Sequence, residues 1–402
     1  MKKKILITAS SMCVGGIERS LVELLNAFDY ERYDVELLLF SREGEFLPEI
    51  TDKCVVLPEI KQCADLLKPI KRNILSGHFI MALSRLYSKL YMALKYKDHG
   101  EDNDALVFAS LQTMWNNAID FMPRLTKKYD VAISFMWPHH FVAKNVNAVK
   151  KFAWIHTDYT KAILDRDADA EIWESFDKLA AVSDECGKSF CEVYPSLSKK
   201  VVTIENILSP ETVRKKAAEF VPDDMPDEGK IKLLTVGRFC FAKAFDRAVD
   251  VCRLLIGRGV KIKWYAVGYG TLETELRNKI SSENLQNDFI ILGKKSNPYP
   301  YMKACDIYVQ PSRYEGKAVT VREAQILGKP VVITNFRTAK SQVRDGFDAV
   351  IADMSAESIA DKIQELISDE NKRKAVSENA YNSAENTDRQ MKRVYDLLEG
   401  RI

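Results

Sequence analysis

The sequence predicts an α/β protein built from two doubly wound halves with a cleft between them. Short apolar runs alternate with helical patterns from the run at 5–8 onward, and the alternation restarts at 232–237. Between the two rounds, residues 208–230 form a charged stretch that contains three prolines. Apolar runs between helices are typical of parallel strands buried on both faces. A chain of 402 residues also exceeds what one core usually supports, so two domains are expected.

The first predicted domain, residues 1–207, begins with a strand, a glycine-containing loop and a helix. After the loop at 10–16, Ile17, Leu21 and Leu24 recur at helical spacing. A helical excursion is expected at about 61–125, and a C-terminal helix at about 385–402 is expected to pack back on this domain. The expected strands are 5–8, 35–40, 131–135, 152–155, 179–182 and 201–204.

The second predicted domain, residues 208–384, repeats the alternation after a linker at 208–230. Pro210, Pro222 and Pro226 and a high density of charge favour an irregular connection there. The expected strands are 232–237, 263–268, 289–293, 306–309 and 331–333.

Composition excludes several classes of protein. A formal charge of +2 gives no global attraction to nucleic acid, and 46% hydrophobic residues argue against disorder. The eight cysteines form no CxxC pair, so buried free thiols in a reducing cytosol are expected. The apolar run 5–7 behind the basic start is too short for a signal peptide or a membrane span. These features predict a cytoplasmic protein.

Two glutamates eight positions apart mark the most informative stretch. Glu315 lies in a loop before Gly316, and Glu323 lies in the helical pattern that follows. A strand, a glycine loop and a helix N-terminus form a natural anion site, because unpaired backbone N–H groups and the helix dipole point at the ligand. Two carboxylates around such a site suit a ligand with an anionic centre and hydroxyl groups on both sides. A nucleotide sugar has that layout.

Two cations follow another expected strand of the second half. Arg238 comes directly after Val236-Gly237, and Lys243 lies five residues later at a helix start. Ligands bind outside the carboxyl ends of parallel strands. Arginine offers a bidentate fork and lysine a mobile point charge, which together fit a diphosphate.

In order along the chain, these motifs resemble the donor half of the retaining nucleotide-sugar glycosyltransferases of family 4. The resemblance covers roughly residues 232–352 and includes the Glu-x7-Glu spacing and glycines at three strand ends. Within that family, the chain resembles glycosyltransferases that make capsular polysaccharide, exopolysaccharide or cell-wall glycopolymers. It implies the GT-B fold, in which two Rossmann-like domains face a central cleft. Residues 1–207 would bind the acceptor and residues 208–384 the donor.

The resemblance also implies roles for individual residues. Arg238 and Lys243 would bind the diphosphate and stabilise charge as the nucleotide leaves. Glu315 would hold the donor sugar and Glu323 the ribose hydroxyls. The implied catalytic residues are His156, Arg238, Lys243 and Glu315, and the implied donor-binding residues are Gly16, Gly237, Arg238, Lys243, Gly293, Lys294, Glu315, Gly316, Ala318, Val319, Thr320 and Glu323.

Two residues depart from the family pattern. Ala244 stands where the family often has glycine, and Lys317 stands where it often has proline. Lys317 has two interpretations: it reaches an anionic part of the donor or acceptor, or it is simply exposed.

The first half carries fewer motifs. Gly15 and Gly16 match the family's glycine-rich first loop, where small residues let the backbone approach the diphosphate or the acceptor. His156 follows the strand 152–155 and resembles the active-site histidine that contacts the donor sugar. Asp158 is a weaker candidate for contact with an acceptor hydroxyl, so the acceptor set is Gly15, Gly16 and Asp158.

The positions of two further features along the chain suggest their roles. His139 and His140 are adjacent, so their side chains do not converge on one metal ion, and both are expected in a loop. Asn206 matches a common asparagine of the family at the domain junction.

Residues 61–97 are unusually basic. Eight lysines and arginines accompany a single acid, Asp65, and apolar residues recur near helical spacing with Tyr87 and Tyr91 among them. A basic amphipathic helix with interfacial aromatic rings suits an anionic membrane surface on the inner face of the plasma membrane. The alternative is a helix whose apolar side packs on the sheet and whose basic side is solvated. Nucleic-acid binding is disfavoured because no reader motif accompanies the charge.

The leading hypothesis is a retaining, metal-independent glycosyltransferase that moves a hexose-type sugar from a nucleotide sugar, in particular a UDP-sugar, to a lipid-linked or cell-envelope saccharide. It requires no cofactor. No Asp-x-Asp clamp follows a suitable strand, because Asp167 and Asp169 are expected in a charged loop. The alternatives are a nucleotide-sugar epimerase of related fold and a catalytically degenerate partner subunit. A dehydrogenase is disfavoured, since no Gly-x-Gly-x-x-Gly follows the first strand.

Overall fold

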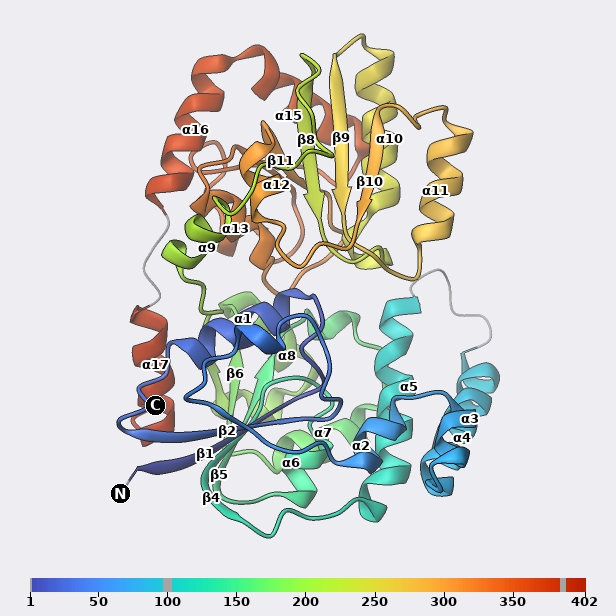
Figure 1. Cartoon of the computed structure of the whole chain (residues 1–402), viewed down its shortest axis with the longest axis vertical. Coiled ribbons are helices and arrows are strands. Elements are labelled where there is room, and N and C mark those ends of the chain that lie inside the picture. The colour runs from blue at the N-terminus through green and yellow to red at the C-terminus, as the bar shows by residue number, and fades with distance from the viewer. Residues whose placement is uncertain (1, 97–102, 384–387) are drawn as a thin grey trace. The chain divides into compact units, whose positions relative to one another are not determined.

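The computed structural model describes residues 2–96, 103–383 and 388–402, which fall into two compact units (Figure 1). The first unit comprises Met1–Cys13, Ile17–Asn206 and Gln390–Ile402. The second comprises Val14–Gly16 and Ile207–Arg389. Each unit is built on its own parallel sheet, so each has its own core.

The sheet of the first unit has seven parallel strands in the order β3-β2-β1-β4-β5-β6-β7. Its interior strand β1 is buried because its residues 5–7 are apolar and helices cover both faces of a parallel sheet. The strands are β1 Lys3–Ala9, β2 Tyr33–Leu39, β3 Val55–Val56, β4 Lys128–Ser134, β5 Asn147–Ile155, β6 Lys178–Ala181 and β7 Val201–Thr203.

The helix α17 (Asp388–Glu399) belongs to the first unit, although it follows the second unit in sequence. The ring of Tyr395 stacks on that of Tyr33 at 5.5 Å, and Glu399 forms an ion pair with Arg32. Figure 1 shows α17 beside the N-terminal elements, with both chain ends in the same unit. The other helices of the sheet layer are α1 Gly16–Asn26, α6 His140–Asn145, α7 Arg166–Glu174 and α8 Asp184–Val193, and the 3-10 helices are η1 Leu47–Glu49, η2 Ile119–Phe121, η3 Tyr159–Lys161 and η4 Pro195–Lys200.

The basic segment 61–97 is not the single helix that the sequence suggested. It forms α2 (Lys61–Leu66), α3 (Ile70–Leu75) and α4 (Phe79–Lys95), while residue 97 lies outside the described residues. Pro69 caps α3, and Gly77 has a φ of +77° between α3 and α4. A proline and a glycine with a positive φ interrupt a helix, and the apolar spacing alone does not reveal such an interruption. A fourth helix, α5 (Asn103–Ala118), packs on α4.

The sheet of the second unit has six parallel strands in the order β10-β9-β8-β11-β12-β13. The strands are β8 Ile231–Val236, β9 Ile262–Val267, β10 Phe289–Gly293, β11 Ile307–Gln310, β12 Val331–Thr334 and β13 Val350–Ala352. The helices are α9 Pro210–Lys216, η5 Phe241–Lys243, α10 Phe245–Gly257, α11 Glu273–Ser282, α12 Tyr299–Ala304, α13 Val319–Ile326, α14 Ala339–Gln342, α15 Ala356–Ser368 and α16 Glu370–Asn382.

Both sheets therefore confirm the predicted doubly wound fold. In each, the chain starts at a middle strand, winds outward to one edge, and returns to the other side of the first strand. The strand order reverses between β1 and β4 in the first unit and between β8 and β11 in the second. Such reversal points, at the carboxyl ends of the strands, are where ligands bind in this class of fold. One expectation was wrong in part: the predicted linker 208–230 contains the helix α9.

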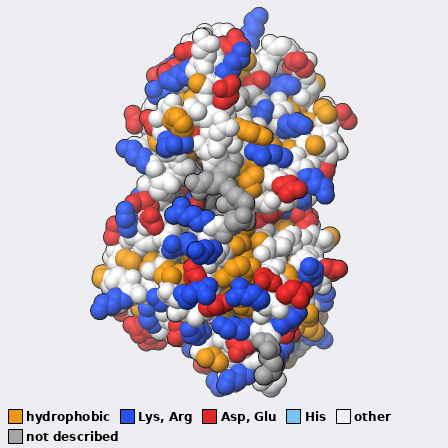
Figure 2. Space-filling model, turned by 90° about the vertical axis from the view of Figure 1, so that its left-hand side faces the viewer, with side chains coloured by type: hydrophobic (Ala, Val, Ile, Leu, Met, Phe, Trp, Pro, Cys, Tyr) orange, Lys and Arg blue, Asp and Glu red, His pale blue; other side chains and the backbone are white. Residues whose placement is uncertain are grey.

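The surface and the thiols agree with the composition. Figure 2 shows the face that carries α16 and α17, where charges of both signs are interspersed. All eight cysteines are free, and six of them are buried. Burial raises the pKa of the Cys186 thiol to about 12. No described helix is both long and apolar enough to cross a bilayer.

Candidate functional site

The reversal point of the second sheet brings two loops together. After β8 the chain passes Gly237 and Arg238, makes the short helix η5, and enters α10. After β11 it passes Ser312 and Glu315 and enters α13. The hydrogen-bonded pairing of β8 with β11 fixes these two strand ends side by side.

Lys243 and Glu315 meet in this loop pair. The Lys243 Nζ lies 2.6 Å from Oε1 and 2.8 Å from Oε2 of Glu315. The side chain of Glu315 is 9% exposed and that of Lys243 is 21% exposed. Because one partner is nearly buried, the pair is held in one geometry rather than being a solvated surface contact.

Polar residues at the end of β11 orient Glu315. Its Oε1 accepts hydrogen bonds from Ser312 Oγ at 2.6 Å and from Gln310 Nε2 at 3.3 Å. Its main-chain oxygen accepts from Thr338 Oγ1 at 3.0 Å. Gln310 is held in turn by the hydroxyls of Tyr308 and Thr320, at 2.7 and 3.1 Å. The carboxylate therefore has a fixed position before any ligand binds.

Arg313 joins the two loops. Its guanidinium donates to both carboxylate oxygens of Asp246, at 2.9 and 2.6 Å, and lies 4.2 Å from the centre of the Phe241 ring. Its main-chain N–H donates to the carbonyl of Ala242 at 2.7 Å. Burial raises the pKa of Asp246, but the hydrogen bonds and charge of Arg313 outweigh burial and lower it overall. Arg313 is thus a positioning residue for the η5 loop.

Arg238 differs from the other cations of this site. It is exposed, and within the described part of the chain it forms no ion pair or side-chain hydrogen bond. Its position after β8, next to Gly237, leaves the guanidinium available to an anion.

The N-terminus of α13 provides backbone donors near Glu315. The first N–H groups of a helix have no acceptor within that helix, and no side chain caps α13 at Ala318. The N–H of Ala318 is different, because it donates to Gln342 Oε1 at 3.1 Å and Gln342 Nε2 donates to the Ala318 carbonyl. Val319 and Thr320 can therefore donate to an anion directly, whereas the Gln342 amide must turn away before Ala318 can.

Glu323 is placed one helical turn further along α13. It is 4% exposed, and its Oε1 accepts a hydrogen bond from the Tyr299 hydroxyl at 2.8 Å. A carboxylate has about four acceptor positions, so one that accepts from a tyrosine hydroxyl is also chemically suited to accept from sugar hydroxyls.

Two glycines after β9 are required by the packing of the site. A Cβ on Gly268 would lie 1.9 Å from the Gly237 oxygen, and one on Gly270 would lie 2.3 Å from the Phe239 oxygen. No side chain fits at either position. Gly293 ends β10 with a φ of +74°, and Lys294 Nζ lies 4.7 Å from the centre of the Tyr269 ring.

The residue Ala244 has a left-handed backbone, with φ of 52° and ψ of 46°. A left-handed backbone favours glycine, which explains why glycine suits this position in the family that the sequence resembles. Ala244 adopts this conformation at the N-cap of α10, where its methyl group is buried.

In the first unit, His156 follows β5. Its Nε2 lies 2.8 Å from the Phe135 carbonyl, which only accepts, so Nε2 carries the proton and Nδ1 is left as an acceptor. Burial lowers the pKa of His156 to about 4, while the bond to Phe135 opposes this. The imidazole is therefore neutral at physiological pH.

Asp158 has a structural task. It is 2% exposed, caps η3, and accepts from the main-chain N–H and the hydroxyl of Thr160 at 3.1 and 2.7 Å. Its assignment to the acceptor stays a prediction. Gly15 and Gly16 group with the second unit, where the Tyr269 hydroxyl donates to the Val14 carbonyl at 2.9 Å.

Three other expectations about the first unit need comment. Asn206 is the last residue of its segment, and its side chain accepts from Ser20 Oγ at 3.0 Å. His139 lies in the loop before α6, as expected, whereas His140 was wrongly expected in a loop because it begins α6; both are fully buried. Asp167 and Asp169 were likewise wrongly placed in a loop.

Both aspartates lie in α7. The carboxylate of Asp169 is buried and accepts from the Tyr159 and Tyr194 hydroxyls and from Trp173 Nε1, at 2.6 to 2.8 Å. Among the described residues, no group of three or more His, Cys, Asp or Glu side chains could hold a metal ion.

Residues 218–383 match the family model of Glycosyl transferases group 1. The matched residues lie within the second unit. The match includes every residue of the Lys243–Glu315 site and excludes His156. Among curated relatives, 157 residues of the chain are 30% identical to the capsular polysaccharide biosynthesis glycosyltransferase CapM of Staphylococcus aureus. That alignment covers 38% of this chain and 40% of CapM.

Solved structures match over nearly the whole chain. HepE of Anabaena, in complex with UDP and glucose, superposes with a TM-score of 0.70 at 15% identity and covers 99% of both chains. A TarM variant of S. aureus, in complex with fondaparinux, alpha-GlcNAc-glycerol and UDP, gives 0.67 at 14% identity and covers 98% of this chain and 99% of its own. These likenesses show the GT-B fold.

Several positioning residues of the second unit were missed from the sequence. They are Tyr299, Gln310, Ser312, Arg313, Thr338 and Gln342. One signal was available: Gln310 and Ser312 place polar groups at alternate positions at the end of an otherwise apolar strand. The other contacts join segments far apart in sequence, which no local pattern reveals.

Proposed function

We propose that the protein is a retaining glycosyltransferase of the family 4 type that uses a nucleotide diphosphate sugar. The observation that carries this proposal is the Lys243–Glu315 pair at the reversal point of the second sheet, between an unpaired Arg238 and the N-terminus of α13. This arrangement offers two cations and backbone donors to a diphosphate and a fixed carboxylate to the adjoining sugar.

The chemistry is a substitution at the anomeric carbon of the donor sugar. The bond from that carbon to the diphosphate oxygen breaks, and a bond to the acceptor oxygen forms on the same face. The acceptor proton passes to the leaving phosphate oxygen. Arg238, Lys243 and the α13 N-terminus stabilise the negative charge of the leaving diphosphate, so a metal ion is not required for that task.

Further donor contacts belong to the same proposal. Glu323 accepts from the ribose hydroxyls, Glu315 holds the sugar hydroxyls, and the loop from Gly293 to Lys294 carries the base. His156 contacts the donor sugar as a neutral imidazole. UDP is the proposed carrier nucleotide, which the UDP complexes of HepE and TarM support.

A cell-envelope or lipid-linked saccharide is the proposed acceptor. The support comes from the printed role of CapM in capsular polysaccharide biosynthesis. A cytoplasmic site at the inner face of the membrane would give the enzyme access to such an acceptor.

A second observation favours membrane contact. The outward face of α3 and α4 exposes large apolar side chains, including Leu75, Leu83 and Leu94, which are 79%, 63% and 83% exposed. Lys71, Arg72 and Lys89 are exposed in the same segment, and its one acid, Asp65, is buried and pairs with Lys68 and His78. Apolar and basic side chains without acids suit an anionic bilayer surface.

The enzymatic proposal is tested by incubating the chain with UDP-glucose, UDP-galactose and UDP-N-acetylglucosamine, with and without a chelator. We expect slow UDP release with one donor, unchanged by the chelator, and an α-configured product by NMR when an acceptor sugar is present. Interconversion of donor epimers without UDP release would identify an epimerase. No turnover of any donor, together with no UDP binding, would favour a degenerate subunit.

A further inference from the structure

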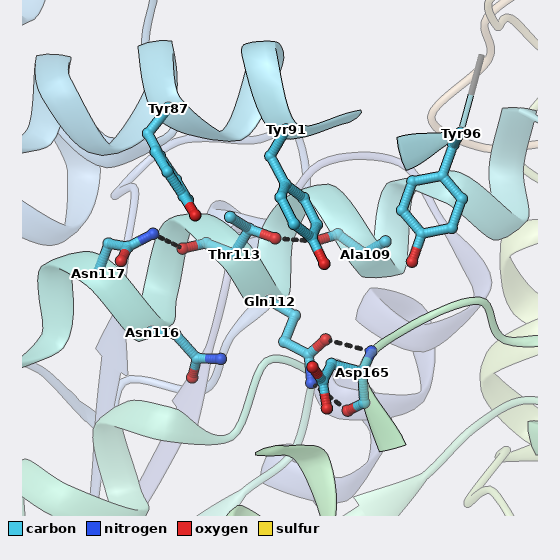
Figure 3. Close-up of a pocket in the computed structure, with 9 residues that line it drawn as sticks. All are labelled: Tyr87, Tyr91, Tyr96, Ala109, Gln112, Thr113, Asn116, Asn117 and Asp165. Atoms are coloured by element: carbon cyan, nitrogen blue, oxygen red, sulfur yellow. Dashed lines mark hydrogen bonds between the residues drawn. The ribbon is translucent and has the colours of Figure 1, made fainter. Parts of the chain in front are cut away.

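A cavity of about 180 Å³ lies between α4 and α5 of the first unit, and none of the residues assigned to the donor lines it (Figure 3). Three tyrosines line one side of it, and amide, hydroxyl and carboxylate groups line the other. The proposed transfer reaction uses none of these residues.

The tyrosines form a row of rings. The rings of Tyr87 and Tyr91 are stacked, with centres 6.1 Å apart and planes at 19°, and Tyr96 meets Tyr91 edge-on at 6.4 Å. Figure 3 shows all three reaching from the end of α4 toward α5. Tyr87 is 53% exposed, so its ring can be reached from solvent.

The opposite wall is polar and held in place. Gln112 makes two hydrogen bonds of 2.8 Å to the main chain of Asp165. One carboxylate oxygen of Asp165 caps α7 by accepting from the Ala168 N–H at 3.2 Å. Within the described residues the other oxygen has no partner, so it can accept a hydrogen bond from a ligand.

Asn116 supplies a donor to the same space. Its Oδ1 lies 2.8 Å from Nε2 of the fully buried His140, and burial lowers the pKa of this histidine to about 3. A neutral His140 donates through Nε2, which fixes the amide orientation of Asn116. Its NH₂ group is therefore presented as a donor, with no second partner in the described part of the chain.

We infer that this pocket binds a neutral sugar residue of a glycan, at a second saccharide site separate from the donor site. A pyranose ring has flat C–H faces that pack on aromatic rings and a rim of hydroxyl groups that pair with amides and carboxylates. The cavity is small, which suits one sugar ring rather than a larger ligand. The carboxylate of Asp165 disfavours phosphates and acidic sugars. The choice of a glycan rests on the proposed glycosyl transfer.

The test uses the full chain with saturating UDP present, so that the nucleotide part of the donor site is occupied. The probes are the methyl glycosides of glucose, galactose and N-acetylglucosamine and their disaccharides, followed by saturation-transfer NMR. We expect saturable binding of at least one probe and about tenfold weaker binding by the Tyr87→Ala, Tyr91→Ala double variant, from loss of two ring contacts. Asn116→Asp, which replaces the amide donor with a carboxylate, should weaken it as well.

Two control variants separate this site from the donor site. Lys243→Ala should keep the saccharide binding while losing UDP affinity, and Leu86→Ala should change neither, since Leu86 is exposed on α4 and does not line the pocket. Binding that survives the tyrosine variant but disappears in Lys243→Ala would overturn the inference. The absence of binding by every probe to the native chain would also overturn it, while UDP release in the donor assay would leave the proposed function intact.

Discussion

At the residue scale, the site of the second unit depends on Lys243. Both Glu315 oxygens contact its ammonium group, and Glu315 is also held by Ser312 and Gln310. A carboxylate that is fixed and nearly buried keeps the ammonium group in one place. In the proposed reaction the lysine would therefore already be positioned for the charge that develops on the leaving diphosphate.

We expect Lys243→Ala to lower turnover by about 100-fold or more, because it removes a preorganised cation from the leaving group. UDP release from the donor would be measured by coupled assay, with the circular dichroism spectrum as a check on folding. Lys279→Ala is the matched control, since Lys279 pairs with Asp250 at 2.7 Å in the same unit, at similar exposure. Equal turnover in the two folded variants would remove Lys243 from the site.

The sequence identified the charged residues of this site but not the residues that hold them in position. Arg238, Lys243, Glu315 and Glu323 follow strands or start helices in a recognisable order. Arg313 was not identified, because its partner Asp246 lies 67 positions away and only the folded sheet brings them together. Asp158 shows the opposite error, since a polar residue after a strand can equally be a buried cap.

At the element scale, every expected strand is present, because short apolar runs between helices have few other outcomes. The strands β3 and β13 were not predicted, since two or three residues are too few to show a pattern. The basic segment was predicted as one helix because the apolar period continues across Pro69 and Gly77. Those two residues interrupt the helix despite the apolar period, and the segment forms the three helices α2, α3 and α4.

The exposed surface of α3 and α4 should bind anionic vesicles. Replacing Lys71, Arg72 and Lys89 with glutamine is expected to weaken binding roughly 100-fold, at about 1 kcal/mol for each charge. Added salt should weaken it in the same way, and donor hydrolysis should not change. Flotation with phosphatidylglycerol vesicles measures the effect.

The control is a triple glutamine variant at Lys261, Lys303 and Lys340, three exposed lysines of the second unit. Two results would contradict the prediction: the control loses as much vesicle binding as the α3–α4 variant, or the native chain does not bind vesicles at all. Either result would show that the segment packs on the domain and exposes its basic side to solvent without binding a membrane. A second variant, Leu83→Ser with Leu94→Ser, tests whether the apolar side chains enter the bilayer.

At the scale of the whole molecule, three histidines with lowered pKa values make the fold sensitive to acid. Burial lowers the pKa of His139, His140 and His156, for His140 to about 3 and for His156 to about 4. The unfolded chain binds protons at these residues near their ordinary pKa of about 6.5, and the native chain does not. The stability they contribute is complete above about pH 6.5 and is lost as the pH falls toward 4.

We therefore expect the free energy of unfolding to fall between pH 7.5 and 5.5, by about 1 kcal/mol for each histidine. Urea unfolding at the two pH values measures this. The window lies above the range in which carboxylates such as Asp246 titrate, so the histidines dominate it. An equal free energy at both pH values would show that the three imidazoles are accessible to protons in the native state.

The return of α17 to the first unit has a consequence for the order of synthesis. Tyr395 stacks on Tyr33, and Glu399 pairs with Arg32, so the first unit uses residues made more than 350 positions apart. A ribosome completes the segment Ile207–Arg389 of the second unit before it makes Gln390–Ile402. The unit that is begun first is therefore finished last, and the nascent chain carries a first unit without its closing helix until the rest of the protein has been translated.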